Sequence, residues 1–347
     1  MRIGLHCHRL DRTGAPLMLF RLARALVARH QVELLLPRDP DHRGPLVAEY
    51  QAIGVPCRES MGLRGYDVFI ANTLMSASLV VDGAAHVPML YWVHEPASGL
   101  AFLRDGRSDP RALALADRVV FPTRWQAEVP FAPWLAGVRW QVVPYGIGID
   151  TTPRPCPFEK IPGRFTLVQV GMISQRKGQD ITLFALRQLA DPTIDLYLLG
   201  SREAAPEVTA QLERGLARLP ELARRVHFTG SVDEATVNAY LQHCDAVVFP
   251  TRDDLITLAI LEAMLFGRCV ISSDFGPIPE TIRHDIDGLL FPVDDGPACA
   301  AAIARARRDP ALVERLGQAA RARYHEKHAF EVHVAAMEAV LEEIRRR

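Results

Sequence analysis

The feature that most constrains the fold is a regular alternation of short apolar runs with stretches of helical periodicity, in two successive series. The runs expected to be strands are 2–5, 31–37, 67–72, 88–94, 118–123 and 140–146, then 165–171, 194–200, 225–230, 246–251, 268–274 and 288–293. Helical patterns lie between several of them, including stretches near 180–190, 205–222 and 233–242. Nearly continuous apolar strands that alternate with helices predict an α/β fold, with parallel sheets covered on both faces.

The two series are separated by residues 151–164, which contain four prolines in fourteen residues and no apolar period. We interpret this stretch as a linker. The expected organisation is a Rossmann-like N-terminal domain over 1–150, the linker, a second Rossmann-like domain over 165–330, and a C-terminal helix over 331–347 that could pack back on the first domain. Two doubly wound domains joined in this way predict a cleft, with ligands beyond the carboxyl ends of the strands.

Composition narrows the class of partner. Hydrophobic residues make up 49% of the chain, and 40 basic residues nearly balance 41 acidic ones. A chain of this kind can bury a core, and it has no basic excess of the sort that favours nucleic acid. The six cysteines form no C-x-x-C pair. His6 and His8 flank Cys7 with the spacing of alternate strand faces, and no second pair of ligands follows, so no metal site is expected.

Two further features bear on location. No apolar run approaches the roughly 20 residues of a membrane helix, and the first residues do not resemble a signal peptide, so a cytoplasmic protein is expected. Residues 122–140 mix Trp125, Trp134 and Trp140 with arginines. Such a mixture can dock on the inner face of a membrane, but burial of the tryptophans in the core is the favoured interpretation.

The segment 251–267, TRDDLITLAILEAMLFG, directly follows a predicted strand, and Asp254 and Glu262 bracket seven uncharged residues in it. A helix that opens near Thr257 would leave backbone N–H groups free to bind a phosphate. Two carboxylates at this spacing could accept hydrogen bonds from the two ends of an elongated, polyhydroxylated ligand. Taken alone, the pattern also fits an acidic helix cap followed by an exposed glutamate.

The longer run 249–293 resembles the C-terminal signature of retaining glycosyltransferases of family four (glycosyl transferases group 1), which have the GT-B fold. The matching positions are Asp254, Glu262, Ala263 and Met264, Gly267, 276–280 and 287–290. The resemblance implies that Glu262 binds the donor ribose and that Asp254 contacts the donor sugar as a catalytic carboxylate. It also implies that the backbone from Leu255 to Leu258, Thr257 included, meets the sugar and the diphosphate.

This sequence departs from the family pattern at two of these positions. Asp254 replaces the family's glutamate, and Ile256 stands where many members have glycine or proline. An aspartate keeps both acceptor oxygens but shortens their reach by about 1.5 Å, one single bond. The replacement of glutamate by Asp254 could alter which donor is bound, or it could mark a loss of activity.

Three further loops resemble the family's donor-binding loops. Arg176 and Lys177 in 170–180 resemble its phosphate-binding pair, although the family's arginine usually stands near Met172, and the same residues also fit a solvated turn. Gly14, in the loop before the first helix, is either an ordinary turn glycine or a point of close approach to the donor phosphate. Val232, in the turn after 225–230, is expected to face the nucleobase.

His94 ends the predicted strand 88–94. The resemblance places a catalytic histidine there, near the reactive carbon of the sugar, whereas a lone histidine at a strand end is usually structural. Asn72 and Thr73 end another predicted strand and are candidates for lining the acceptor side.

The resemblance thus predicts a metal-independent, retaining glycosyltransferase without a cofactor, with the domain over 1–150 on the acceptor side and the domain over 165–330 on the donor side. Its donor would be a UDP-, GDP- or ADP-sugar, and its acceptor a carbohydrate or a glycolipid. Two alternatives remain open: a sugar-nucleotide epimerase, and a non-catalytic, transferase-like partner subunit.

Overall fold

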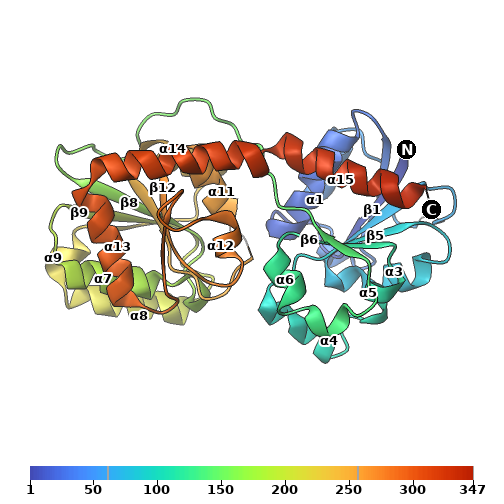
Figure 1. Ribbon diagram of the computed structural model, residues 1–347, viewed down its shortest axis with the longest axis horizontal. Coiled ribbons are helices and arrows are strands. Elements are labelled where there is room, and N and C mark those ends of the chain that lie inside the picture. The colour runs from blue at the N-terminus through green and yellow to red at the C-terminus, as the bar shows by residue number, and fades with distance from the viewer. Residues whose placement is uncertain (61, 256–257, 347) are drawn as a thin grey trace. The chain divides into compact units, whose positions relative to one another are not determined.

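The computed structural model describes residues 1–60, 62–255 and 258–346. The chain forms two compact units, Met1–Gly146 with Phe330–Arg347, and Ile147–Ala329. Each unit is a parallel sheet with helices packed on it (Figure 1). Residues 151–164, the predicted linker, lie inside the second unit. The prediction of two α/β, Rossmann-like domains is confirmed.

The first unit has a seven-stranded sheet in the order β3-β2-β1-β4-β5-β6-β7. Its strands are β1 (Arg2–Cys7), β2 (Gln31–Leu35), β3 (Cys57–Arg58), β4 (Val68–Asn72), β5 (Met89–Trp92), β6 (Arg118–Phe121) and β7 (Trp140–Val142). Its helices are α1 (Gly14–Leu26), α2 (Leu46–Ala52), α3 (Ala77–Gly83), α4 (Ala101–Arg104), α5 (Arg111–Leu115), α6 (Arg124–Glu128) and α15 (Phe330–Arg345). Every residue of β4 and β5 is buried, as expected of strands that are covered on both faces.

The second unit has a six-stranded sheet in the order β10-β9-β8-β11-β12-β13. Its strands are β8 (Phe165–Val170), β9 (Ile194–Leu199), β10 (Val226–Gly230), β11 (Ala246–Phe249), β12 (Cys269–Ser273) and β13 (Leu289–Phe291). Its helices are α7 (Gln179–Leu189), α8 (Pro206–Ala217), α9 (Pro220–Ala223), α10 (Glu234–His243), α11 (Leu258–Leu265), α12 (Ile278–Thr281), α13 (Gly296–Arg308) and α14 (Pro310–Lys327). The single helix expected near 205–222 is wrong: it is broken between α8 and α9, because Pro220 has no N–H to continue α8.

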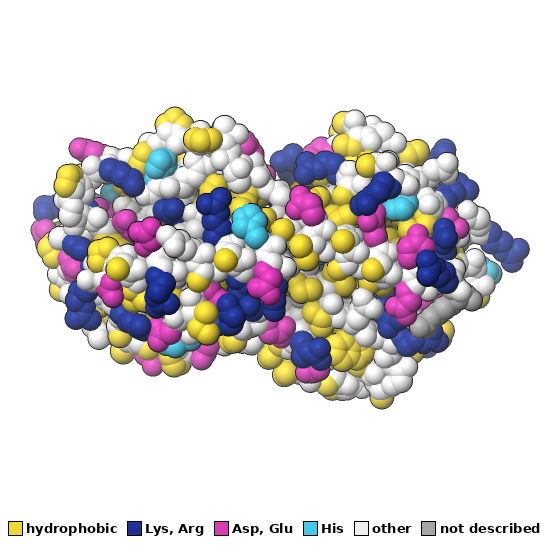
Figure 2. All heavy atoms as spheres, turned by 45° about the horizontal axis from the view of Figure 1, so that its top comes forward, with side chains coloured by type: hydrophobic (Ala, Val, Ile, Leu, Met, Phe, Trp, Pro, Cys, Tyr) yellow, Lys and Arg dark blue, Asp and Glu magenta, His cyan; other side chains and the backbone are white. Residues whose placement is uncertain are grey.

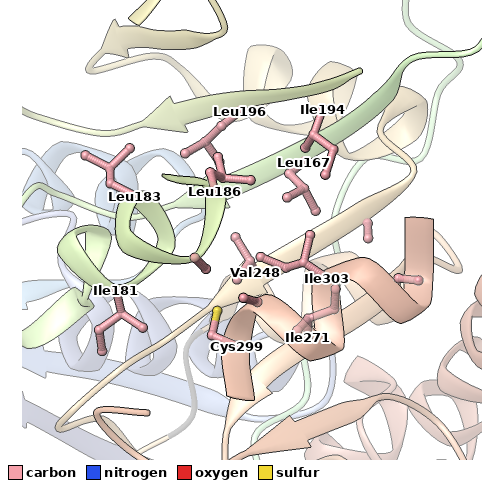
Figure 3. Close-up of a cluster of buried hydrophobic side chains, with 14 of the residues drawn as sticks. Leu167, Ile181, Leu183, Leu186, Ile194, Leu196, Val248, Ile271, Cys299 and Ile303 are labelled. Carbon is pink, nitrogen blue, oxygen red and sulfur yellow. The ribbon is translucent and has the colours of Figure 1, made fainter. Parts of the chain in front are cut away.

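The core of the second unit lies between one face of its sheet and helices α7 and α13. Leu167 and Val248 from the strands meet Ile181 and Leu186 of α7 and Ile303 of α13 (Figure 3). This packing holds β8 and β11 side by side, with Leu167 opposite Ala246. The loops that follow these two strands therefore start next to each other, at the carboxyl edge of the sheet.

Three of the four aromatic residues of 122–140 belong to the core packing of the first unit. Phe131 is fully buried, and Trp134 and Trp140 pack against the same core cluster. This arrangement favours the core interpretation of the tryptophans over membrane docking. No helix in the described part of the chain is long and apolar enough to cross a membrane.

On the face shown in Figure 2, lysines and arginines alternate with acidic side chains and form no field of one sign. This distribution agrees with the formal net charge of −1.

Candidate functional site

The loops after β8 and β11 bring two cations onto one carboxylate. The Lys177 Nζ lies 2.6 Å from the Asp254 Oδ2, and a guanidinium nitrogen of Arg176 lies 3.1 Å from the same oxygen. Arg176 also donates to the backbone oxygen of Asp253 at 2.7 Å. Lys177 and Asp254, 77 residues apart in the sequence, are each only 14% exposed. The structure thus assembles three of the predicted site residues at one point.

The backbone under this cluster is fixed by a close approach of the two loops. Gly178 has φ +69°, and a Cβ atom there would lie 1.9 Å from the backbone oxygen of Pro250. Gln169 donates to the Lys177 oxygen at 2.9 Å, and the Arg252 N–H donates to the Arg176 oxygen at 2.8 Å. These contacts set the positions from which both cationic side chains extend.

Arg252 acts as a brace that sequence reasoning missed. Its guanidinium donates to the Gln175 oxygen at 2.6 Å and to both carboxylate oxygens of Asp180 at 2.9 and 2.7 Å. It also bonds Asp294 at 2.5 Å. The signal was present, since an arginine directly precedes Asp253 and Asp254 in the loop after β11, but its partners come from distant segments.

Substituting Gly178 with alanine should destabilise the second unit strongly. The left-handed backbone costs about 1–2 kcal/mol for a residue with a Cβ atom, and the clash with Pro250 adds an overpacking cost of about 1–3 kcal/mol. The matched control is Gly215→Ala in α8, where a Cβ would meet nothing within 4 Å and should stabilise by about 0.5–1 kcal/mol. Thermal and urea unfolding of both variants measure the difference. Equal stability of the two variants would contradict the close approach.

The other donor-site candidates of the second unit lie on the same sheet edge or outside the described residues. Thr257, like Ile256, is outside them. Leu258 is the first described residue of α11, and Glu262, one turn further along that helix, is half-buried. Val232 is half-buried in the turn between β10 and α10, where Asp233 caps the helix by accepting from the Thr236 N–H at 2.8 Å. At Met172, near which the family's arginine usually stands, the side chain is 48% exposed.

The sequence contains two D-x-D strings, 39–41 and 285–287, of the kind that binds a metal ion in metal-dependent transferases, and three of their four acidic side chains have protein partners. Asp287 is fully buried and accepts from the N–H and Nε of Arg283, at 2.5 and 2.6 Å. Asp285 pairs with Arg305, and Asp39 accepts from the Asp41 N–H at 3.0 Å. Within residues 1–60, 62–255 and 258–346, no three His, Cys, Asp or Glu side chains converge as metal ligands would.

In the first unit, His94 is a buried, neutral ring with both nitrogens engaged. Asn72 donates to the Ala15 oxygen at 3.1 Å, which turns its Oδ1 toward the His94 Nε2 at 2.6 Å. The Nε2 atom therefore carries the proton, and Nδ1 accepts from the Tyr145 hydroxyl at 2.6 Å. Burial lowers the pKa of His94 to about 3, with a smaller effect from His333. The arrangement holds an uncharged ring in place and leaves neither nitrogen to act as a base.

A cavity of about 180 Å³ in the first unit is bounded in part by His94, His8, Thr73 and Glu95. Gly14 lies at the start of α1, between Thr13 and Ala15, which both line this cavity. A Cβ atom on Gly14 would meet nothing within 4 Å, so packing does not require a glycine there. That openness agrees with the predicted close approach of a ligand, which stays a prediction.

Glu95, which follows His94, is a buried residue whose role sequence reasoning did not predict. Its carboxylate accepts from the Leu74 N–H at 2.7 Å and the His94 N–H at 3.0 Å, tying the ends of β4 and β5 together. Burial raises the pKa of Glu95 to about 7, against the opposing effect of these hydrogen bonds. Next to it, Thr73 has φ +75°, a conformation that costs energy for a β-branched residue.

Known proteins match this chain over part or most of its length. Residues 164–309 match the family model described as glycosyl transferases group 1. The D-rhamnosyltransferase WbpZ of Pseudomonas aeruginosa is 32% identical over 54% of this chain, which spans about half (49%) of that protein's length. The phosphatidyl-myo-inositol mannosyltransferase of Mycobacterium leprae is 24% identical over 91% of this chain and 90% of its own length.

Solved structures share the fold over nearly the whole chain. The structure of Anabaena HepE in complex with UDP and glucose has a TM-score of 0.78 at 20% identity and covers 99% of both chains. Sucrose-phosphate synthase from Thermosynechococcus elongatus has a TM-score of 0.76 at 21% identity, over 99% of this chain and 98% of that one. Residues 164–309 therefore resemble the glycosyl transferases group 1 family, and the chain has the fold of the GT-B glycosyltransferases.

Proposed function

We propose that this protein transfers a hexose from a nucleoside diphosphate sugar to a carbohydrate or glycolipid acceptor. The observation that carries the proposal is the cluster of Lys177, Arg176 and Asp254 at the adjoining ends of β8 and β11, inside the matched family domain. The relatives support the type of reaction, since the two similar proteins are named as a rhamnosyltransferase and a mannosyltransferase. The HepE structure with UDP and glucose favours a UDP-sugar as the first donor to test.

The proposed roles follow the order of strands along the sheet edge. Lys177 and Arg176 hold the diphosphate, Asp254 and the backbone from Leu255 to Leu258 contact the donor sugar, and Glu262 accepts from the ribose hydroxyls. The turn at Val232 follows β10, two strands away from β8, which corresponds to roughly 10 Å. A nucleotide laid across the strand ends could span that distance, with its base at Val232. Donor contacts by Gly14 and His94 stay predictions of the family resemblance.

In this proposal, the residues act by electrostatic stabilisation of the charge that develops during transfer. As the bond between the sugar and the diphosphate breaks, the sugar becomes oxocarbenium-like and negative charge builds on the departing phosphate. Two positioned cations stabilise that charge with little reorganisation, which is why the proposal needs no metal ion. The acceptor oxygen forms the new glycosidic bond, in the proposal with retention of the anomeric configuration. A glycolipid acceptor would be met from the cytoplasm, at the inner face of the membrane.

Two observations leave a non-catalytic role to be tested. Asp254, shorter than the family's glutamate, is paired with both cations, and Met172 stands near the usual position of the family's arginine. A transferase-like partner subunit would bind a second protein and leave a sugar donor unchanged. An epimerase would convert the donor without any acceptor, so product analysis with and without an acceptor separates the three functions.

A thermal-shift panel of UDP-, GDP- and ADP-sugars tests donor binding. Ligand at about 100 times its Kd stabilises the folded protein by about 2.7 kcal/mol. The sugar nucleotides that carry the preferred base should therefore raise the Tm by several degrees. Glu262→Ala should weaken binding of that donor by about 10- to 100-fold, because a charged hydrogen bond contributes about 1.5–3 kcal/mol. Glu314→Ala, at an exposed position of α14, is the matched control and should bind as the wild type does. Absence of any shift with the wild-type protein would overturn the proposal.

A further inference from the structure

The cations that the proposed function assigns to the donor diphosphate already have an anionic partner. We infer that Asp254 is an internal counter-ion of Lys177 and Arg176, which competes with a bare diphosphate and is drawn away when a donor sugar is present. The residue would thereby favour the sugar nucleotide over the nucleoside diphosphate that remains after transfer. This inference rests on the proposed function and concerns the same site.

The contacts of Asp254 differ from those of an ordinary surface ion pair. Its Oδ2 is shared by the Lys177 Nζ at 2.6 Å and the Arg176 guanidinium at 3.1 Å, so one oxygen stands where both cations converge. Its Oδ1 accepts from the Leu255 N–H at 3.1 Å. With Lys177 and Asp254 each 14% exposed, water screens the pair less than it screens exposed charges.

A phosphate oxygen and the Asp254 carboxylate cannot both occupy this point. Two anions within about 4 Å of each other repel strongly where solvent is limited, so a diphosphate that engages Lys177 must displace Oδ2. The loops cannot separate to make room, because the packing of Gly178 on Pro250 and the Arg252 brace hold their backbones together. The side chain of Asp254 is therefore the group that moves when a diphosphate binds.

A sugar on the diphosphate changes the balance. Its hydroxyl groups offer hydrogen-bond donors to the displaced carboxylate, so Asp254 exchanges one set of partners for another. A nucleoside diphosphate without the sugar offers none, and Asp254 then competes to return to the cations. The same residue thus contributes to holding the donor and to releasing the product.

The test measures the affinities of pyrophosphate, of the nucleoside diphosphate that the panel selects and of its sugar nucleotide, by calorimetry at fixed salt. Asp254→Asn should bind pyrophosphate and the nucleoside diphosphate about five- to tenfold more tightly than the wild type, because the competing charge is gone. The preference for the sugar nucleotide over the diphosphate should fall by a similar factor. Asp294→Asn removes a nearby charge that is 60% exposed and pairs with Arg252, and it should change each affinity less than twofold.

Two outcomes separate this inference from the proposed function. If the wild type binds a sugar nucleotide and Asp254→Asn binds diphosphates no more tightly, the counter-ion role is wrong and the donor site stands. If the wild type binds neither sugar nucleotide nor pyrophosphate, both fail. Asp254→Ser serves as a second variant should the asparagine variant fold poorly, and it should shift the affinities in the same direction.

Discussion

Replacing Lys177 with alanine should lower kcat/KM for sugar transfer by about 10²- to 10³-fold, the usual effect of removing one positioned group that stabilises developing negative charge. The Lys177 Nζ is the closer of the two cations to Asp254, and its side chain is largely shielded from solvent. Arg176 remains in the variant, so binding of the donor should weaken less than turnover.

Steady-state kinetics with the donor selected by thermal shift measures this effect. Lys160→Ala is a charge-matched control, because Lys160 is exposed in the segment before β8. Lys177→Arg keeps the charge and should recover part of the loss, although a guanidinium fork fits the place of an ammonium group poorly. Wild-type turnover in Lys177→Ala would remove this residue from the proposed mechanism.

The first unit should lose stability as the pH falls from about 6.5 to about 3, because His94 is neutral when folded and becomes protonated when unfolded. Its folded pKa of about 3 lies below the ordinary value of 6.5, so the stability it contributes is present above 6.5 and lost as the pH falls through 3. A difference of this size corresponds to about 5 kcal/mol at the acid limit. His8, whose pKa burial lowers to about 4, acts in the same direction.

Glu95 acts in the opposite direction over part of this range. Its folded pKa of about 7 lies above the ordinary 4.5, so its contribution is present below 4.5 and lost as the pH rises through 7. The loss of stability on acidification should therefore be steepest between pH 4.5 and 4, where both histidines act unopposed, and about half as steep between pH 6.5 and 4.5, where Glu95 offsets one of them.

Urea unfolding followed by tryptophan fluorescence tests the histidine effect in the first unit alone, because Trp92, Trp125, Trp134 and Trp140 all belong to it. His94→Gln should be less stable than the wild type at pH 7.5 and approach or exceed it near pH 3.5. The control is His86→Gln, at an exposed position, which shows what loss of a histidine on the surface does to stability over the same pH range. A His94→Gln difference that is constant across the range would refute the assignment.

The sheet architecture could be predicted from the sequence because strands that are buried on both faces have almost continuous apolar sequences. The stretches around 68–72, 89–92 and 246–249 are continuous apolar runs for this reason, and all three are strands. The two-residue strand β3 carries too little pattern to be seen. Pro220 is a sequence signal for the break between α8 and α9, but the helical periodicity of 205–222 favoured a single helix.

The site was predictable as a set of residues but not as a set of contacts. Family resemblance pointed to Lys177 and Asp254, yet their pairing depends on the register of β8 against β11, which no local pattern contains. Glu95 illustrates the same limit. A glutamate after a strand is usually exposed, and its burial here depends on N–H groups from two separate loops.

The return of the last helix to the first unit has a consequence for synthesis. Helix α15 packs against α1, β4 and β5, and His333 on it bonds the Pro144 oxygen at 2.8 Å. The second unit is one uninterrupted stretch, Ile147–Ala329, while the first is split around it. On the ribosome the second unit can therefore finish folding before the first, which must wait, with part of its core uncovered, until its final residues emerge.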